Sequence, residues 1–283
     1  MICELKDIPV HYELFGEGRP IVMLHGWGID HRHMLSTMEP LFEKRHGWKR
    51  IYFDLPGHGK TPGKDWVTNQ DRILDVILDF IDAVIPGQRF VVAGASAGAY
   101  LARGVVHHRM ESMDGLLLEV PLISAYTARR HVPAPVTLLA DPVLVSTLSP
   151  DDAEGYFPFA VVQSQKVADF VHTNYTAAGQ AGDQAFQAKI REHDENYAFS
   201  FDVDALPKPF PAPTLIVTGR QDSICGYRDA WEILENYPRA TFAVLDRSGH
   251  FVETEQEDLF HALAGEWLDR VKEYAGVLDS DGR

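Results

Sequence analysis

The stretch Phe90-Val91-Val92-Ala93-Gly94-Ala95-Ser96-Ala97-Gly98 decides the fold. It begins with a short, continuously apolar run, which is typical of a strand buried on both faces in a parallel sheet. It ends in a G-x-S-x-G pattern, and a helical stretch follows over residues 99–107. The segment therefore predicts a strand, a sharp turn and a helix, with the Ser96 hydroxyl projecting from the edge of the sheet.

Similar short apolar runs recur along the chain, and helical patterns separate them. The runs cover residues 21–24, 50–54, 116–118, 215–217 and 242–245. Amphipathic helices are predicted over 69–85 and over 255–274, the second with Leu259, Leu263, Trp267 and Val271 on its buried side. The N-terminal segments 2–5 and 10–15 alternate in hydrophobicity and predict an antiparallel edge. Strands that alternate with helices predict an α/β fold with a doubly wound, mostly parallel sheet.

One region interrupts this alternation. From about residue 121 the chain is rich in aromatic residues and short helical pieces, with prolines at both ends of the region. We expect residues 121–205 to form an inserted helical cap, and residues 1–120 and 206–283 to form the core domain. The polar tail, residues 279–283, is expected to fray.

Composition limits the possible partners and compartments. The 283 residues contain 26 Lys and Arg against 41 Asp and Glu, a formal net charge of −15. This charge argues against nucleic acid and anionic membrane surfaces as partners. The two cysteines, Cys3 and Cys225, cannot form a disulfide framework, and no apolar run is long enough to span a membrane. We expect a cytoplasmic protein, monomeric or homodimeric, that acts on a small molecule.

A serine needs a general base, which is usually a histidine oriented by a carboxylate. Asp222 follows the run at 215–217, and His250 follows the run at 242–245. Both positions lie beyond the C-terminal ends of predicted strands, where open parallel sheets place their sites. The order Ser, Asp, His is the one expected for this type of turn. Glu119, just after the run at 116–118, is the alternative carboxylate.

An oxyanion formed by serine attack needs two backbone N–H donors. We expect one from Ala97, the residue after the serine, and the other from Trp27, in the loop after the run at 21–24. His25, Gly26, Glu119 and Phe251 are further candidates for contact with the substrate.

Five motifs together resemble the α/β-hydrolase fold family, in particular its capped, cofactor-free esterases and carbon–carbon hydrolases. They are His25-Gly26-Trp27-Gly28, Asp54-Leu55-Pro56-Gly57-His58-Gly59, Gly94-Ala95-Ser96-Ala97-Gly98, Gly219-Arg220-Gln221-Asp222 and Ser248-Gly249-His250-Phe251. The resemblance implies Ser96 as nucleophile, His250 as base, Asp222 as acid and an oxyanion hole from Trp27 and Ala97. It implies no metal, nucleotide or flavin cofactor.

A metal site is the alternative interpretation of His25, His31 and His33, with Asp30 and Asp54 as oxygen ligands. The His-x-His at 31 and 33 lacks the Asp-His that would follow it in a metallohydrolase. We therefore expect these side chains to lie behind the site or on the surface, with no metal bound.

The activity expected from these residues is hydrolysis of a small, apolar carboxylic ester through an acyl-enzyme. Two alternatives stay open at this point. The same residues could cleave a carbon–carbon bond in a diketone or ring-fission product, or the chain could be a receptor-like hydrolase that signals through its cap.

Overall fold

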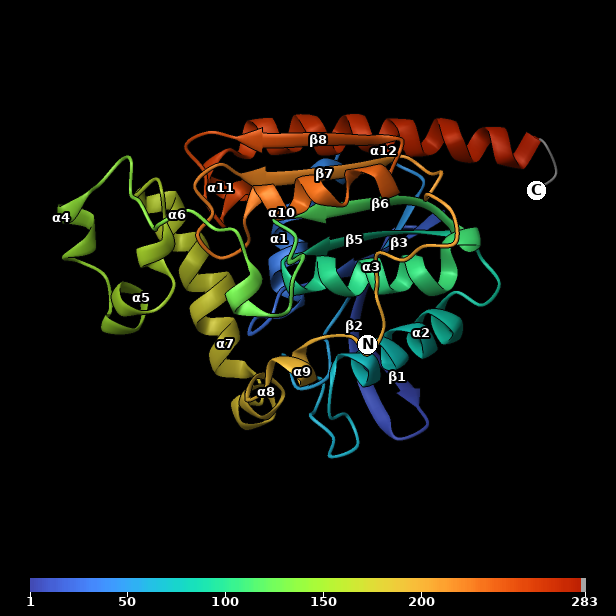
Figure 1. Cartoon of the computed structure of the whole chain (residues 1–283), viewed down its shortest axis with the longest axis horizontal. Helices are drawn as coiled ribbons and strands as arrows, with labels where there is room; N and C mark the ends of the chain where they lie inside the picture. Colours follow the sequence, from blue (N-terminus) through green and yellow to red (C-terminus); the bar gives the residue numbers. More distant parts are fainter. Residues whose placement is uncertain (281–283) are drawn as a thin grey trace.

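The computed structural model describes residues 1–280, and its centre is one eight-stranded sheet (Figure 1). The strand order is β1-β2-β4-β3-β5-β6-β7-β8. Strand β2 pairs antiparallel with β1 and β4, and all pairs from β4 to β8 are parallel. The strands are β1 Ile2–Leu5, β2 Ile8–Phe15, β3 Arg19–Leu24, β4 Trp48–Phe53, β5 Phe90–Ala95, β6 Met113–Glu119, β7 Thr214–Gly219 and β8 Ala240–Leu245. The prediction of a doubly wound, mostly parallel sheet with an antiparallel edge is confirmed.

Helices connect the strands and cover both faces of the sheet. They are α1 His31–Phe42, α2 Gln70–Val84, α3 Ala97–Arg109, α4 Pro142–Val145, α5 Pro150–Glu154, α6 Gln165–Val171, α7 Ala177–Ala181, α8 Gln184–Arg191, α9 Asp194–Tyr197, α10 Tyr227–Glu232, α11 Val252–Glu255 and α12 Glu257–Ser280. Single 3₁₀ turns cover Met110–Ser112, Thr127–Arg129, Phe157–Phe159 and Leu234–Asn236, and a π-helical turn covers His172–Thr176. No helix within residues 1–280 is long and apolar enough to cross a membrane.

Alternate side chains of the parallel strands enter two separate cores. On β3, Val22 and Leu24 pack with α2 and α3, whereas Ile21 and Met23 pack with α1 and α12. Because both faces are buried, the strands are apolar at successive positions, which is the pattern that the sequence displays. The ends of α2 agree with the predicted helix over 69–85, because Asn69 caps it by accepting a hydrogen bond from the Arg72 N–H.

The buried side of the C-terminal helix, α12, differs from the predicted one. Leu259 is 51% exposed, and Phe260, Ala264, Trp267, Leu268 and Val271 form the buried side. Leu259 and Trp267 belong to the same continuous helix, α12. A spacing of four residues drifts by about 40° per step on a helix of about 3.6 residues per turn, so Leu259 lies about 80° around the axis from Trp267 and falls outside the buried stripe. The predicted fraying of 279–283 falls partly on residues 281–283, which lie outside the described residues. Helix α12 continues to Ser280.

Helices α4 to α9 lie between β6 and β7 in the chain. In space they lie beyond the ends at which strands β5 to β8 point (Figure 1). These helices have an apolar cluster of their own, which includes Phe157, Val171 and Tyr175. The cluster also contains Ile29 from the loop after β3 and Phe251 from the loop after β8. This arrangement places the helices over the edge where the predicted site residues lie. The division into a core domain, residues 1–120 and 206–283, and a helical cap, residues 121–205, stays a prediction.

Candidate active site

Ser96 lies at the turn between β5 and α3 in a strained backbone conformation. Its φ is 53° and its ψ is −116°, a combination that residues with a side chain rarely adopt. The carbonyl of Ser96 accepts hydrogen bonds from the N–H groups of Ala99 and Tyr100, so α3 starts directly behind the serine. The strained turn presents the hydroxyl at the end of the sheet, as the G-x-S-x-G pattern predicts.

Two glycines of this motif are required by close backbone approach. A Cβ on Gly94 would lie 2.5 Å from the carbonyl oxygen of Gly98, and a Cβ on Gly98 would lie 2.2 Å from the carbonyl oxygen of Leu24. No real Cβ tolerates such distances, so only glycine allows strand β5, helix α3 and the loop after β3 to meet here.

The structure brings Ser96, His250 and Asp222 together. The Ser96 Oγ lies 3.1 Å from Nε2 of His250, and Nδ1 of His250 lies 2.9 Å from Oδ2 of Asp222. The other carboxylate oxygen of Asp222 accepts hydrogen bonds from the backbone N–H groups of Ile224 and Cys225, at 2.8 and 3.0 Å. Because an ionised carboxylate only accepts, Nδ1 of His250 carries its proton toward Asp222 and Nε2 is left to accept from the serine hydroxyl.

The environment of His250 favours its protonated form more than water does. Burial alone would lower the pKa of the imidazole, but the charge of Asp222 and the hydrogen bond to it raise the pKa above its ordinary value. Glu253 adds to this rise, and Arg130 opposes it. His250 is therefore a stronger base than a free histidine.

The N–H groups of Trp27 and Ala97 lie on the two backbone segments beside Ser96. Ala97 is the first residue of α3, and Trp27 belongs to the loop after β3. Within residues 1–280, neither N–H donates a hydrogen bond. The loop is close to the serine, because a Cβ on Gly26 would lie 3.4 Å from the Cβ of Ser96. Free N–H donors beside a serine hydroxyl can stabilise an oxyanion.

His25 holds this loop in place from behind. Its Nδ1 lies 2.7 Å from the carbonyl oxygen of Gly26, and its Nε2 accepts a hydrogen bond from the N–H of Leu55. These two contacts require a neutral imidazole protonated on Nδ1, and burial lowers the pKa of His25. The side chain thus positions Gly26 and Trp27.

A cavity of about 220 Å³ opens onto the serine, between the sheet edge and the inserted helices. Of the predicted substrate contacts, Gly26 lines this cavity, whereas His25, Glu119 and Phe251 are fully buried outside its lining. The apolar and aromatic part of the lining consists of Trp27, Ile29, Val120, Leu122, Tyr156, Tyr175, Tyr197 and Ile224. Cys225 also lines it, 4.0 Å from the serine hydroxyl, and burial raises the pKa of its thiol, so the group stays protonated.

Two guanidinium groups, those of Arg130 and Arg191, complete the lining of the cavity. Arg130 donates to the carbonyl oxygens of Ser124 and Ala125, and Arg191 lies over the ring of Tyr197 at 4.1 Å. In the described part of the chain, no carboxylate lies within 4 Å of either guanidinium. Neither arginine was predicted as a site residue, because Arg130 follows a single 3₁₀ turn, Arg191 ends helix α8, and no motif marks either position.

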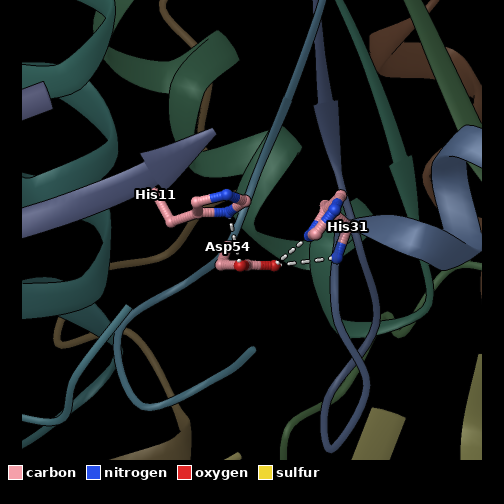
Figure 2. Close-up of side chains that lie close together, drawn as sticks. All are labelled: His11, His31 and Asp54. Carbon is pink, nitrogen blue, oxygen red and sulfur yellow. Dashed lines mark hydrogen bonds and ion pairs between the residues drawn. The ribbon is translucent and has the colours of Figure 1, made fainter. Parts of the chain in front are cut away.

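A separate cluster joins His11, His31 and Asp54 behind the loop after β3 (Figure 2). One oxygen of Asp54 accepts from the backbone N–H and Nδ1 of His31, and the other accepts from Nδ1 of His11 and the N–H of Lys60. All four donors are satisfied by one carboxylate, so the cluster acts as a structural junction of β2, α1 and the loop after β4. His31 and His33 are 5% and 2% exposed, so the surface alternative for these side chains is wrong.

A model of the alpha/beta hydrolase family matches residues 21–263, which include the sheet from β3 onward and all three residues of the Ser96 hydrogen-bond chain. The chain belongs to the alpha/beta hydrolase family. The predicted resemblance is thereby confirmed, and the chain is a hydrolase.

Relatives within this family have different named activities. The chain is 24% identical over 268 residues to pimeloyl-[acyl-carrier protein] methyl ester esterase of Legionella pneumophila (strain Corby), covering 92% of this chain and 99% of that protein. It is 23% identical to 2-hydroxy-6-oxo-6-(2'-aminophenyl)hexa-2,4-dienoic acid hydrolase of Metapseudomonas resinovorans, covering 93% of this chain and 88% of that protein. An alpha/beta superfamily hydrolase from Oenococcus oeni PSU-1 has a similar structure, with a TM-score of 0.82 and 24% identity over 93% of this chain and 96% of that one.

Proposed function

We propose that this family member is a serine hydrolase that cleaves a small carboxylic ester through an acyl-enzyme on Ser96. The observation that carries the proposal is the hydrogen-bond chain from the Ser96 hydroxyl through His250 to Asp222, at the wall of a closed-in cavity. A serine so connected is activated toward attack on a carbonyl carbon.

In the first half-reaction, Nε2 of His250 takes the proton of the Ser96 hydroxyl while Oγ forms a bond to the ester carbonyl carbon. The carbonyl oxygen becomes an oxyanion, which accepts hydrogen bonds from the N–H groups of Trp27 and Ala97. The imidazolium then gives its proton to the ester oxygen, the carbon–oxygen bond breaks, and the alcohol leaves. Asp222 stabilises the imidazolium throughout.

In the second half-reaction, His250 takes a proton from water, and the hydroxide attacks the acyl carbon on Ser96. The same two N–H groups stabilise the second oxyanion. Its collapse releases the carboxylic acid, and Oγ regains a proton from His250.

The cavity supports a small substrate with an apolar body and a negative group. Aromatic and aliphatic side chains make up most of its lining, and 220 Å³ limits the size of the part that enters. No carboxylate of residues 1–280 lies within 4 Å of the Arg130 or Arg191 guanidinium group, so an anionic group on the substrate would supply a partner. The proposed substrate differs in one respect from the apolar ester expected from the sequence. It keeps the apolar body and has in addition a negatively charged group.

Carbon–carbon bond hydrolysis is the second candidate function. The two arginines favour it as well, because a relative is named for a substrate that is a dienoic acid, and such an acid is an anion at neutral pH. The attacking group and the oxyanion donors would be the same, with a carbanion in place of an alkoxide as the leaving group.

A substrate panel separates the candidates. We expect multiple turnovers with methyl hemiesters of short dicarboxylic acids, and loss of that activity in Ser96→Ala. Turnover of a dienoate diketone without turnover of any ester would replace the first candidate with the second. A single turnover followed by retention of the product would instead favour a receptor-like role.

A further inference from the structure

Three buried side chains from separate elements meet beside the candidate active site. They are Glu119 at the end of β6, Glu253 in α11 and His33 in α1. One potential ligand atom from each lies within 4.8 Å of the other two. His33 also lines the cavity that contains Ser96, so the cluster lies directly behind the cavity wall.

The cluster has polar atoms that the protein leaves without partners. Glu119 is 0% exposed and Glu253 is 4% exposed. Within residues 1–280, no N–H group and no hydroxyl group donates to either oxygen of Glu119 or to Oε2 of Glu253, and the two carboxyl groups lie within hydrogen-bond reach of each other. Buried carboxylate oxygens are normally paired, because burying an unpaired one costs several kcal/mol or more.

The two carboxylates also lack a compensating charge. No lysine or arginine among the described residues lies within 4 Å of either. Among residues 1–280, the basic side chain in contact with the pair is that of His33, whose Nε2 lies 3.0 Å from Oε1 of Glu253.

We propose that His33, Glu119 and Glu253 bind a divalent metal ion, with zinc the best match to this set of ligands. One imidazole and two carboxylates are ligands that zinc accepts, and its two positive charges would neutralise both glutamates.

The donor atoms lie within 4.8 Å of one another, so small side-chain shifts would bring them to the separations found around one ion. Zinc bonds to nitrogen and oxygen of 2.0–2.2 Å place neighbouring ligands of a tetrahedral ion about 3.3–3.6 Å apart. Nε2 of His33 lies 3.0 Å from Oε1 of Glu253 and 3.4 Å from the hydroxyl oxygen of Tyr175. Tyr175, from the turn His172–Thr176 of the insertion, is therefore placed to fill a fourth position. An ion at this point would join α1, β6 and α11 of the core to the insertion.

Two other groups of possible ligands in the described residues lack these properties. In the His11–His31–Asp54 cluster, hydrogen bonds already occupy both carboxylate oxygens (Figure 2). The group of His131, Asp229 and Glu232 includes two exposed side chains, and Asp229 already accepts from His131. Only the cluster at His33 combines burial, unpaired oxygens and uncompensated charge.

The test is a metal titration of the full chain after treatment with a chelator and removal of the chelator. We expect one zinc ion per chain in competition with a chromophoric chelator, and visible absorption bands when cobalt(II) replaces zinc. The double variant Glu119→Gln/Glu253→Gln and the single variant His33→Asn should each weaken binding at least tenfold. His107→Asn is the matched control. Within residues 1–280, the Nδ1 atoms of His33 and of His107 are both buried without a hydrogen-bond partner, but His107 lies on α3, outside the cluster.

Zinc-soaked crystals of the wild type provide a readout that does not depend on variant folding. An anomalous-scattering peak within about 2.2 Å of the His33, Glu119 and Glu253 donor atoms would support the proposal. Absence of stoichiometric binding at micromolar zinc would overturn it. Equal affinity in wild type and in Glu119→Gln/Glu253→Gln, or an anomalous peak only at His131 and Asp229, would overturn it as well.

Discussion

Nε2 of His250 lies 3.1 Å from the hydroxyl oxygen of Ser96, although 154 positions separate the two residues in the sequence. Strands β5 and β8 end at the same edge of the sheet, and each of the two residues follows one of these strands. The contact therefore depends on the register of the whole sheet. The proposed activity of Ser96 depends on this contact.

Asp222→Asn should lower kcat about 10³–10⁴-fold and change KM little. An amide at this position can turn its NH₂ group toward Nδ1 of His250, which would force the imidazole proton onto Nε2 and remove the base. The amide oxygen can still accept from the N–H groups of Ile224 and Cys225, so the fold should be kept. Steady-state kinetics measures kcat and KM, and circular dichroism checks that the fold is kept. A loss of less than tenfold would contradict the proposed role of Asp222.

Activity should fall at acidic pH, with a midpoint above about 6.5, the ordinary pKa of histidine. The base acts only when neutral, and the charge of Asp222 raises the pKa of His250 despite its burial. As the pH falls through this raised pKa, the imidazole becomes protonated and the serine can no longer be activated. A profile of kcat/KM against pH measures the midpoint. A midpoint below pH 6 would show that His250 is not the titrating base.

Glu255→Ala should destabilise the fold by several kcal/mol, because it leaves three backbone donors unpaired at about 1–3 kcal/mol each. The carboxylate accepts from the N–H groups of Gly249, Val161 and Val162 and so joins the His250 loop to the insertion. Denaturant unfolding measures the change. Glu266→Ala, an exposed site on α12, is the control and should change stability little.

Glu255→Gln tests the charge of the same group. Burial raises the pKa of Glu255 to about 7, although the three N–H groups oppose this. The folded state therefore binds this proton more tightly than the unfolded chain does, for which 4.5 is the reference. Its contribution to stability is complete below that value and is lost as the pH rises through about 7. The free energy of unfolding of Glu255→Gln should lack this decline; an unchanged decline would contradict the assignment.

Asp54→Ala should cost about 3–5 kcal/mol of stability, because it removes the common acceptor of a buried polar junction. Burial alone would raise the pKa of Asp54, but hydrogen bonding to His31 and the neighbouring imidazoles hold it well below its usual range. A lowered pKa means that Asp54 stabilises the fold above the unfolded value and loses this contribution as the pH falls through the folded one. The melting temperatures of the wild type and of Asp54→Ala, measured at neutral and acidic pH, should approach each other as the pH falls. A difference in melting temperature between wild type and Asp54→Ala that is the same at every pH would contradict this role of Asp54.

Arg191→Gln should reduce the preference for a methyl hemiester over the matching neutral dimethyl ester by about tenfold, the value of a charge-assisted hydrogen bond. The ratio of the two kcat/KM values measures this and cancels any general loss of activity. Arg72→Gln is the matched control, because Arg72 pairs with Asp75 on the solvent-exposed side of α2. An unchanged ratio in Arg191→Gln would remove the anionic group from the proposed substrate without affecting the role of Ser96.

The residues that could be predicted from sequence are those whose positions depend on strand ends. Ser96, Asp222 and His250 each follow a recognisable apolar run, and parallel strands bring such positions to one edge. Helix α1 has no clear apolar periodicity, since Pro40 lies inside it and buried histidines occupy its first turn, so it was not predicted. Leu259 was assigned to the buried side because a spacing of four residues was followed over two steps, and this spacing drifts away from one face of a helix of about 3.6 residues per turn.

The remaining site residues depend on contacts between distant segments. Arg191 reaches the cavity from the end of α8, and His33 meets Glu253 across 220 positions of sequence. No local period or motif encodes such contacts, because they follow from the packing of the insertion and of α1 against the sheet edge. The assembled fold is needed to reveal the buried carboxylates, and to show that no carboxylate of the described residues lies within 4 Å of the Arg130 and Arg191 guanidinium groups.

The most direct measurement is covalent labelling with a fluorophosphonate probe, followed by intact-mass analysis and peptide mapping. We predict one label per chain, on the peptide that contains Ser96. It should be absent in Ser96→Ala and strongly slowed in His250→Ala, while Ser124→Ala, a serine outside the proposed site, labels like the wild type. A wild-type protein that resists the probe, or a label that persists in Ser96→Ala, would contradict the assignment of Ser96 as the nucleophile.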